Sequence, residues 1–120
     1  MKREVLFYRK SGGECPVEGF LDALPTKAAR KVVWVLNLAE DLERVPSHHF
    51  CKLADTDDIW EFRVKAGSNI FRVFAFWDGP RIILTHGFVK KTQKTPREEI
   101  RMAESFKEDY FKEQTEGRLK

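Results

Sequence analysis

Short apolar runs along the chain predict the strands of a sheet. Four of them, at residues 5–8, 59–64, 70–77 and 82–89, are rich in β-branched and aromatic side chains, as strands commonly are. Asp78-Gly79, between the last two runs, is a strong hairpin signal. Because the last three strands follow one another through short connections, we expect them to be antiparallel.

Two amphipathic runs near the N-terminus predict helices. Pro16 opens the first, whose apolar residues recur at helical spacing until Pro25 ends it. The second runs from its predicted N-cap, Thr26, to about residue 45, and Pro46 stops it. The polar residues that follow, 46–58, are predicted to form a loop.

A third helix is predicted at the C-terminal end. Thr95-Pro96-Arg97-Glu98 is a capping box with proline at the first helical position. Apolar residues recur at helical spacing from there to Tyr110, and residues 114–120 are expected to form a frayed tail.

The order of these elements predicts an α+β domain. Two N-terminal helices are expected to pack on one side of an antiparallel sheet of about four strands, followed by a C-terminal helix. A chain of 120 residues is too short for two cores of ordinary size, so residues 1–113 are interpreted as a single domain.

Composition narrows the class of protein. With 42% hydrophobic and 34% charged residues, the chain has the composition of a folded globular domain. It contains neither an apolar run long enough to span a bilayer nor the apolar core of a signal peptide, so a cytoplasmic protein without membrane contact is expected. Cys15 and Cys51 are then expected to be free thiols.

The distribution of charge is more informative than the net charge of +3. Between residues 81 and 97 there is no acidic residue, and the basic ones are Arg81, His86, Lys90, Lys91, Lys94 and Arg97. Such a block is typical of a polyanion site, and the helix N-terminus predicted at Thr95 would also attract anions. The alternative is a solvated loop before a helix.

Arg72 interrupts the most apolar run of the chain. A guanidinium in the middle of a strand needs water, an acid or a ligand. One interpretation is an ion pair with Glu61 on the neighbouring strand; the other is a clamp on a phosphate, which arginine binds through two parallel hydrogen bonds. The second predicts that Arg72→Ala abolishes activity and leaves the fold intact. Arg63, two residues from Glu61 and on the same strand face, is a candidate for a surface salt bridge or for RNA contact.

Strand alternation gives a further expectation about the neighbours of Arg72. If the Asp78-Gly79 turn has an even number of residues, Arg72 shares a face with Thr85, Gly87, Val89 and Lys91. Gly87 would then leave open space beside it. His86 would point to the opposite face, where a core histidine is more expected than a proton shuttle, while Phe88 could pack in the core or stack on a base.

No metal site or cofactor is expected. His48, His49 and Cys51 lie close together, but no second cluster occurs at a ligand spacing. The chain also lacks a glycine-rich phosphate loop and a nucleophile elbow.

Three segments together resemble a known family, the phage-derived, HigB-like branch of the RelE/ParE toxin superfamily. The resemblance covers roughly residues 3–112 and is densest from 59 to 100. The segments are Trp60-Glu61-Phe62-Arg63-Val64, Asn69-Ile70-Phe71-Arg72-Val73-Phe74 and Gly87-Phe88-Val89-Lys90-Lys91-Thr92-Gln93-Lys94-Thr95-Pro96.

This resemblance implies a microbial RNase fold and a toxin that cleaves mRNA in the ribosomal A site without metal. The 2′-hydroxyl attacks the adjacent phosphate and leaves a cyclic phosphate. Arg72 matches the arginine that holds the scissile phosphate, and Lys90 and Lys91 match a basic pair after the last strand. The usual partner is a helix-turn-helix antitoxin, through which alone such a toxin reaches operator DNA.

The chain departs from well-studied members at two places. Their preceding strand carries lysines where this chain has Trp60-Glu61-Phe62, and their C-terminal tyrosine has no match near Pro96-Arg97. Four residues are therefore candidates for the general base: Lys90, Lys91, His86 and Glu61. The predicted RNA contacts are Arg63, Phe88, Lys94 and Arg97.

Two other functions remain open at this point. ParE-like relatives share the fold but inhibit DNA gyrase by binding it, without RNA chemistry. A domain that has lost activity and only binds its antitoxin would carry the same sequence features.

Overall fold

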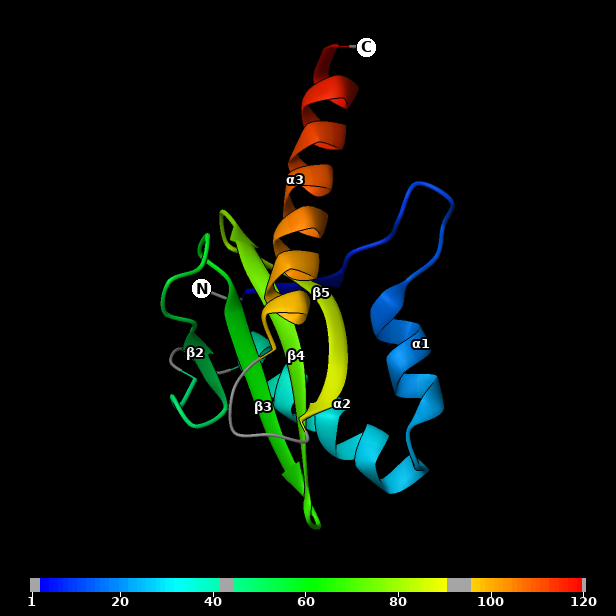
Figure 1. Cartoon of the computed structure of the whole chain (residues 1–120), viewed down its shortest axis with the longest axis vertical. Coiled ribbons are helices and arrows are strands. Elements are labelled where there is room, and N and C mark those ends of the chain that lie inside the picture. Colours follow the sequence, from blue (N-terminus) through cyan, green and yellow to red (C-terminus); the bar gives the residue numbers. More distant parts are fainter. Residues whose placement is uncertain (1–2, 42–44, 91–95, 120) are drawn as a thin grey trace.

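The protein is a three-layer α+β domain (Figure 1). The computed structural model describes the backbone of residues 3–41, 45–90 and 96–119, and side chains as far as residue 115. In chain order the elements are β1 (Glu4–Phe7), α1 (Pro16–Ala23), α2 (Thr26–Asp41), β2 (Phe50–Lys52), β3 (Trp60–Ala66), β4 (Asn69–Asp78), β5 (Arg81–Lys90) and α3 (Arg97–Leu119).

The sheet is mixed, with five strands in the order β1-β5-β4-β3-β2. The prediction of an antiparallel sheet of about four strands was thus wrong in two respects, the number of strands and the direction of one of them. β1 pairs in parallel with β5, and two helices and three strands separate these two strands along the chain, so no short hairpin joins them. The short β2 lies inside the predicted loop 46–58; its Phe50 stacks on Phe62, with ring centroids 4.3 Å apart.

Helices cover both faces of the sheet, and the two N-terminal helices share one face, as predicted. α1 and α2 pack on the face that carries Phe62, Val73 and Leu84. α3 packs on the opposite face, where Phe74 and Phe76 lie beneath it. β4 and β5 are buried on both faces, which explains why the sequence of each strand is a nearly continuous apolar run.

A β-bulge in β5 decides which side chains share a face with Arg72. Near the turn, Asp78 pairs with Arg81 across a two-residue loop, so the condition of an even-numbered turn is met. Further along, Ala75 pairs with Leu84 but Phe74 pairs with His86, which leaves Thr85 as the extra residue. Beyond Thr85, each side chain of β5 therefore lies on the face opposite to the one that unbroken alternation from the turn would give it.

The reversal overturns the predicted surroundings of Arg72. Arg72 lies opposite Phe88, so it shares its face with His86, Phe88 and Lys90 rather than with Thr85, Gly87, Val89 and Lys91. The sequence pattern gives no sign of the bulge, since successive residues of β5 are buried on both faces near it and no alternation remains.

Gly87 lies on the α1 side and provides no space beside Arg72. A Cβ added there would lie 2.4 Å from Cδ2 of Phe20 and 2.8 Å from Cγ, so the whole ring would have to move. The glycine is thus required by the approach of α1 to β5.

We therefore expect Gly87→Ala to lower the free energy of unfolding by about 1–3 kcal/mol through overpacking. Urea denaturation measures this. Gly19→Ala, with nothing within 4 Å of the added Cβ, is the matched control and should cause no such loss. Adding Phe20→Leu to Gly87→Ala should recover part of the stability; an unchanged double variant would contradict the clash.

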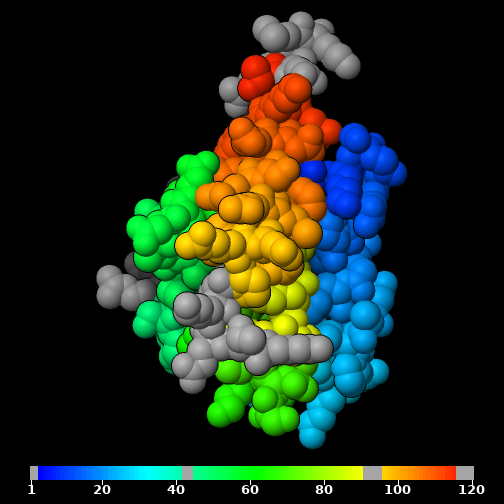
Figure 2. Space-filling view, viewed as in Figure 1, coloured from blue at the N-terminus to red at the C-terminus, as the bar shows by residue number. Residues whose placement is uncertain are grey.

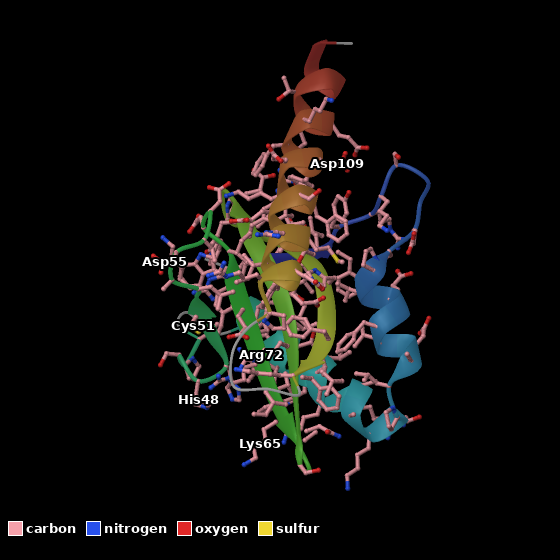
Figure 3. The ribbon with its side chains drawn as sticks, in the orientation of Figure 1. His48, Cys51, Asp55, Lys65, Arg72 and Asp109 are labelled. Carbon is pink, nitrogen blue, oxygen red and sulfur yellow. The ribbon has the colours of Figure 1, made fainter. Side chains whose placement is uncertain are left out.

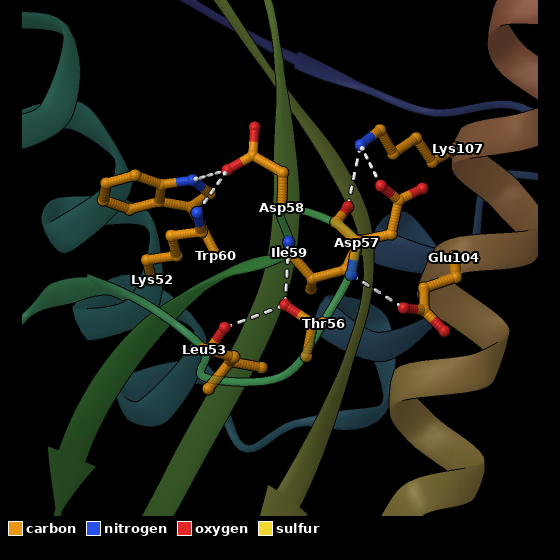
Figure 4. A network of polar contacts seen from close by, with 9 residues as sticks. All are labelled: Lys52, Leu53, Thr56, Asp57, Asp58, Ile59, Trp60, Glu104 and Lys107. Carbon is orange, nitrogen blue, oxygen red and sulfur yellow. Dashed lines mark hydrogen bonds and ion pairs between the residues drawn. The ribbon is translucent and has the colours of Figure 1, made fainter.

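Side-chain contacts hold α3 against the upper part of its face. Tyr8 stacks on Phe106 with ring centroids 4.8 Å apart, and the hydroxyl of Tyr110 donates to Asp78 at 2.7 Å. At the β2–β3 loop, Lys107 binds Asp57, whose backbone N–H donates to Glu104 at 2.9 Å (Figure 4). α3 begins at mid-height of the sheet and runs upward past its end (Figures 1 and 2). Its backbone is helical to Leu119, through residues interpreted from sequence as a frayed tail.

Candidate functional site

The lower half of the α3-side face contains a buried ion pair, Arg72–Glu61. Each residue is only 2% exposed, and Nη1 of Arg72 donates to Oε1 of Glu61. The two lie on adjacent strands, where Arg72 pairs with Arg63 and Glu61 pairs with Phe74. The ion-pair interpretation of Arg72 is thus confirmed. Its guanidinium lies beneath the surface, so a phosphate meets other cations first.

Those other cations are Arg63 and Lys90. Arg63 is exposed, and Lys90, the last residue of β5, is partly buried. The pKa of Lys90 is lowered, first by burial and then by the charge of Arg72, with Arg63 acting in the same direction and Glu61 opposing. Arg63 and Arg72 are thus near enough to Lys90 for their charges to act on it. We call Arg63, Arg72 and Lys90 the cationic cluster.

Two further residues border the cluster and were missed in the sequence analysis. Lys65 follows Arg63 by two positions on β3 and is exposed on the same face, so strand alternation alone could have identified it. Cys51 pairs with Glu61 across β2 and β3, and burial raises the pKa of its thiol. It could not be placed, because β2 was not predicted. Figure 3 shows Cys51, Arg72 and Lys65 in the lower half of the molecule, with Asp109 of α3 well above them.

His86 belongs to the packing beneath α3. Its Nε2 lies 3.2 Å from Oε2 of Glu99, and its Nδ1 lies 3.1 Å from the hydroxyl of Thr85. The ring is 5% exposed and packs against Phe74 and Phe106. Four strand residues, or about 13 Å, separate it from Lys90. It is a core histidine as expected, although on the opposite face from the one predicted.

The burial of His86 gives the fold a pH dependence. Burial lowers the pKa of its imidazole, and the charge of Glu99 only partly opposes this. In the unfolded chain the imidazole binds its proton more readily, with a pKa of about 6.5. The free energy of unfolding is therefore highest above that pH and falls as the pH drops below it. We expect the melting temperature to fall between pH 7.5 and pH 5.5. His86→Gln should flatten that fall and His48→Gln, at an exposed site, should not; an unchanged slope in His86→Gln would contradict this.

Phe88 lies between His86 and Lys90 on the same face and is half-buried. Its ring meets Phe74 edge-on with centroids 5.1 Å apart, which supports it from one side. Since part of the ring remains accessible beside the cationic cluster, it can both pack in the core and offer a surface to a base.

Of the cations at and after the end of β5 in the predicted basic block, the structure describes Lys90 and Arg97. Lys90 closes β5, and Arg97 is the exposed first residue of α3. Arg97 lines a shallow groove of about 410 Å³ together with Asp55, Arg101 and Glu104. Lys91 and Lys94 lie outside the described residues. Arg97 thus stands at the other end of the segment that leaves the cationic cluster.

The described residues also bear on the expectations about a membrane and a metal. No helix among them is long and apolar enough to cross a membrane, and no group of three or more His, Cys, Asp or Glu side chains within them could hold a metal ion. Cys15 and Cys51 are free thiols, as predicted.

An α+β domain with positive charges gathered on one sheet face has features that are typical of proteins that bind polyanions. A model of the family described as phage derived protein, Gp49-like, matches residues 19–108. The chain belongs to this phage-derived Gp49-like family, which is of the RelE/Gp49 toxin type and is associated with toxin–antitoxin systems. The match includes every described residue of the candidate site. No curated protein matches the chain.

Proposed function

We propose that the protein is the HigB-like toxin of a type II toxin–antitoxin module and acts in the cytoplasm as a metal-independent, ribosome-dependent mRNA endonuclease. The observation that carries the proposal is the cationic cluster on the α3-side face of the sheet, with Lys90 at the end of a central strand. Family membership supports the toxin class, and the cluster supports RNA as the substrate.

The chemistry requires a base near a phosphate. Lys90 is the candidate, because its lowered pKa gives it a larger neutral fraction than an ordinary lysine has. Its Nζ would take the proton of the 2′-hydroxyl while the 2′-oxygen attacks the phosphorus. The bond from phosphorus to the 5′-oxygen breaks, and that oxygen takes a proton from water as it leaves. The products are a 2′,3′-cyclic phosphate and a 5′-hydroxyl.

The arginines have different parts in this proposal. Arg63 is exposed and can bind the scissile phosphate directly. Arg72 is a positioning residue: its buried pair with Glu61 joins β3 to β4, and its charge helps to lower the pKa of Lys90. Glu61 is already engaged by Arg72 and is therefore a weaker candidate for the base than Lys90.

The remaining described residues proposed to contact RNA lie on or next to the α3-side face of the sheet. Phe88 can stack on an unpaired base next to the cleaved phosphate. Arg97 is an exposed positive charge at the first residue of α3, and Lys91 and Lys94 are proposed as further cations for the RNA. Since several phosphates are neutralised, binding should weaken steeply as salt rises. The proposed partner is a helix-turn-helix antitoxin, through which the protein would reach operator DNA.

Induction of the protein in bacterial cells, with mapping of mRNA 5′ ends, tests the proposal. We expect growth arrest and new ends inside translated codons, in frame, that disappear when translation initiation is blocked. Arrest with intact mRNA and a DNA-damage response would favour a gyrase inhibitor instead. Neither arrest nor new ends would leave only a binding domain.

A further inference from the structure

The face of the sheet opposite the cationic cluster carries an open groove of about 600 Å³. One wall is the corner that joins α1 to α2, and the other consists of the ends of β3, β4 and β5. Its surface is mainly apolar, with Leu24 and Ala28 on the helical wall and Phe71 and Val89 on the sheet wall. The corner and the β3–β4 hairpin lie next to each other at the lower end of the molecule (Figures 1 and 2).

The rim of this groove is positively charged. Lys27 and Lys31 line it, both are exposed, and their spacing of four residues places them on one side of α2. No carboxylate belongs to the lining. The groove therefore combines an apolar floor with a positive rim.

The charges of α2 are arranged against its own dipole. Lys27, Arg30 and Lys31 lie in its first two turns, and no acidic residue lies in the first; Glu40 and Asp41 stand at its C-terminal end, where no basic residue lies. A helix is stabilised by the reverse order. These lysines thus do not stabilise α2, and they add to the positive potential of its N-terminal end beside the groove.

The form of the occupant follows from the walls. The edge strands β1 and β2 do not line the groove, and its sheet wall includes Phe71 and Val89, which pair with each other across the two central strands. A partner in the groove therefore packs on the face of the sheet. Phe71 is the aromatic residue of the lining and is only 3% exposed, so it offers no face on which an RNA base could stack. What the groove does offer is room for apolar side chains beneath a rim that attracts carboxylates.

We propose that the groove binds an acidic amphipathic helix of a protein partner, with the apolar side chains of that helix in the groove and its carboxylates against Lys27 and Lys31. The naming of this partner as the antitoxin rests on the proposed function; the docking surface does not. Phe71 and Val89 line the groove, while the residues that follow them, Arg72 and Lys90, belong to the cationic cluster on the other face of the sheet. An occupant therefore contacts the same strand ends that carry the proposed chemistry, from the opposite side.

A labelled synthetic peptide of glutamate and leucine tests the proposal, with leucines at i, i+3, i+4 and i+7 so that one helical face is apolar. Its binding to the full chain is followed by fluorescence anisotropy. A peptide of equal composition with the leucines dispersed around the helix is the control ligand. We expect the amphipathic peptide to bind and the dispersed one to bind at least about tenfold more weakly, a difference of about 1.4 kcal/mol.

Charge reversal locates the binding. Lys27→Glu/Lys31→Glu should weaken the amphipathic peptide at least about tenfold. Arg101→Glu/Lys112→Glu, which makes the same change of net charge on exposed positions of α3, should leave the affinity nearly unchanged. Equal loss in both variants, equal binding of both peptides, or no binding would overturn the proposal.

A competition experiment tests whether the groove binds RNA instead of a protein helix. Displacement of the peptide by a single-stranded oligoribonucleotide, with RNA binding also lost in Lys27→Glu/Lys31→Glu, would assign the groove to RNA and overturn the proposal. The peptide measurements involve no RNA cleavage, so a chain that binds the peptide but leaves mRNA intact would refute the proposed nuclease and uphold the docking surface.

Discussion

Arg72→Ala is expected to lower the free energy of unfolding by about 3–5 kcal/mol, because it removes one partner of a buried ion pair. The carboxylate of Glu61, 2% exposed, would remain in the protein without the guanidinium that now binds it. A small domain has only about 5–15 kcal/mol in total, so much of the chain could unfold at 37 °C. Urea denaturation of the purified variant measures the loss.

A matched pair of apolar replacements separates the fold from the chemistry. Arg72→Met and Glu61→Leu should each destabilise the chain, while the double variant should recover most of the stability, since a buried ion pair can often be exchanged for apolar residues. A stable Arg72→Ala would contradict the buried pair and support the phosphate clamp. A stable double variant that still arrests growth would show that Arg72 is needed only for folding.

Much of the fold could be predicted because its elements carry strong local signals. Pro16, Pro25 and Pro46 bound α1 and α2 at or near the observed ends, and Asp78-Gly79 marks a turn between β4 and β5. The Arg72–Glu61 pair was one of two open interpretations, and it could be named because an isolated charge in an apolar strand needs a partner.

What was missed depends on contacts between distant residues. β2 has three residues and is held by pairing with β3 and by stacking of Phe50, neither of which leaves a periodic pattern. The side on which α3 packs is decided by Tyr8, Phe74 and Phe106. Strands buried on both faces give no alternation, so the sequence cannot indicate which face a helix covers.

The bulge at Thr85 had the largest effect on the predicted site. One extra residue moved Gly87 and Val89 to the α1 side and brought His86, Phe88 and Lys90 to the face of Arg72. A shift of one residue exchanges the two faces of a strand completely. The residue types that form the cationic cluster could be chosen from sequence, but their grouping on one face could not.

Lys90→Met is expected to lower the rate of mRNA cleavage by about 10²–10⁴-fold, the usual contribution of a positioned base. Lys90→Arg keeps the positive charge but cannot release its proton near neutral pH. The cleavage rate of Lys90→Arg should therefore fall as well, while its affinity for RNA stays close to that of the wild type. In the wild type the rate should rise with pH through the pKa of Lys90, which burial and Arg72 hold below its ordinary value. Cleavage of mRNA on programmed ribosomes, measured over a range of pH, gives these quantities.

Lys112→Met is the matched control, because Lys112 is exposed on α3, away from the cluster. It should cleave at the wild-type rate and show the same pH profile. If Lys90→Arg cleaves normally, Lys90 contributes charge and not a base, and the base must be sought among Lys91, His86 and Glu61. If the wild-type rate does not change with pH while Lys90→Met is slow, Lys90 positions the phosphate together with Arg63. Because Lys90 is at the end of β5 and only partly buried, its replacement should leave the melting temperature nearly unchanged, so that a loss of rate reports on the chemistry.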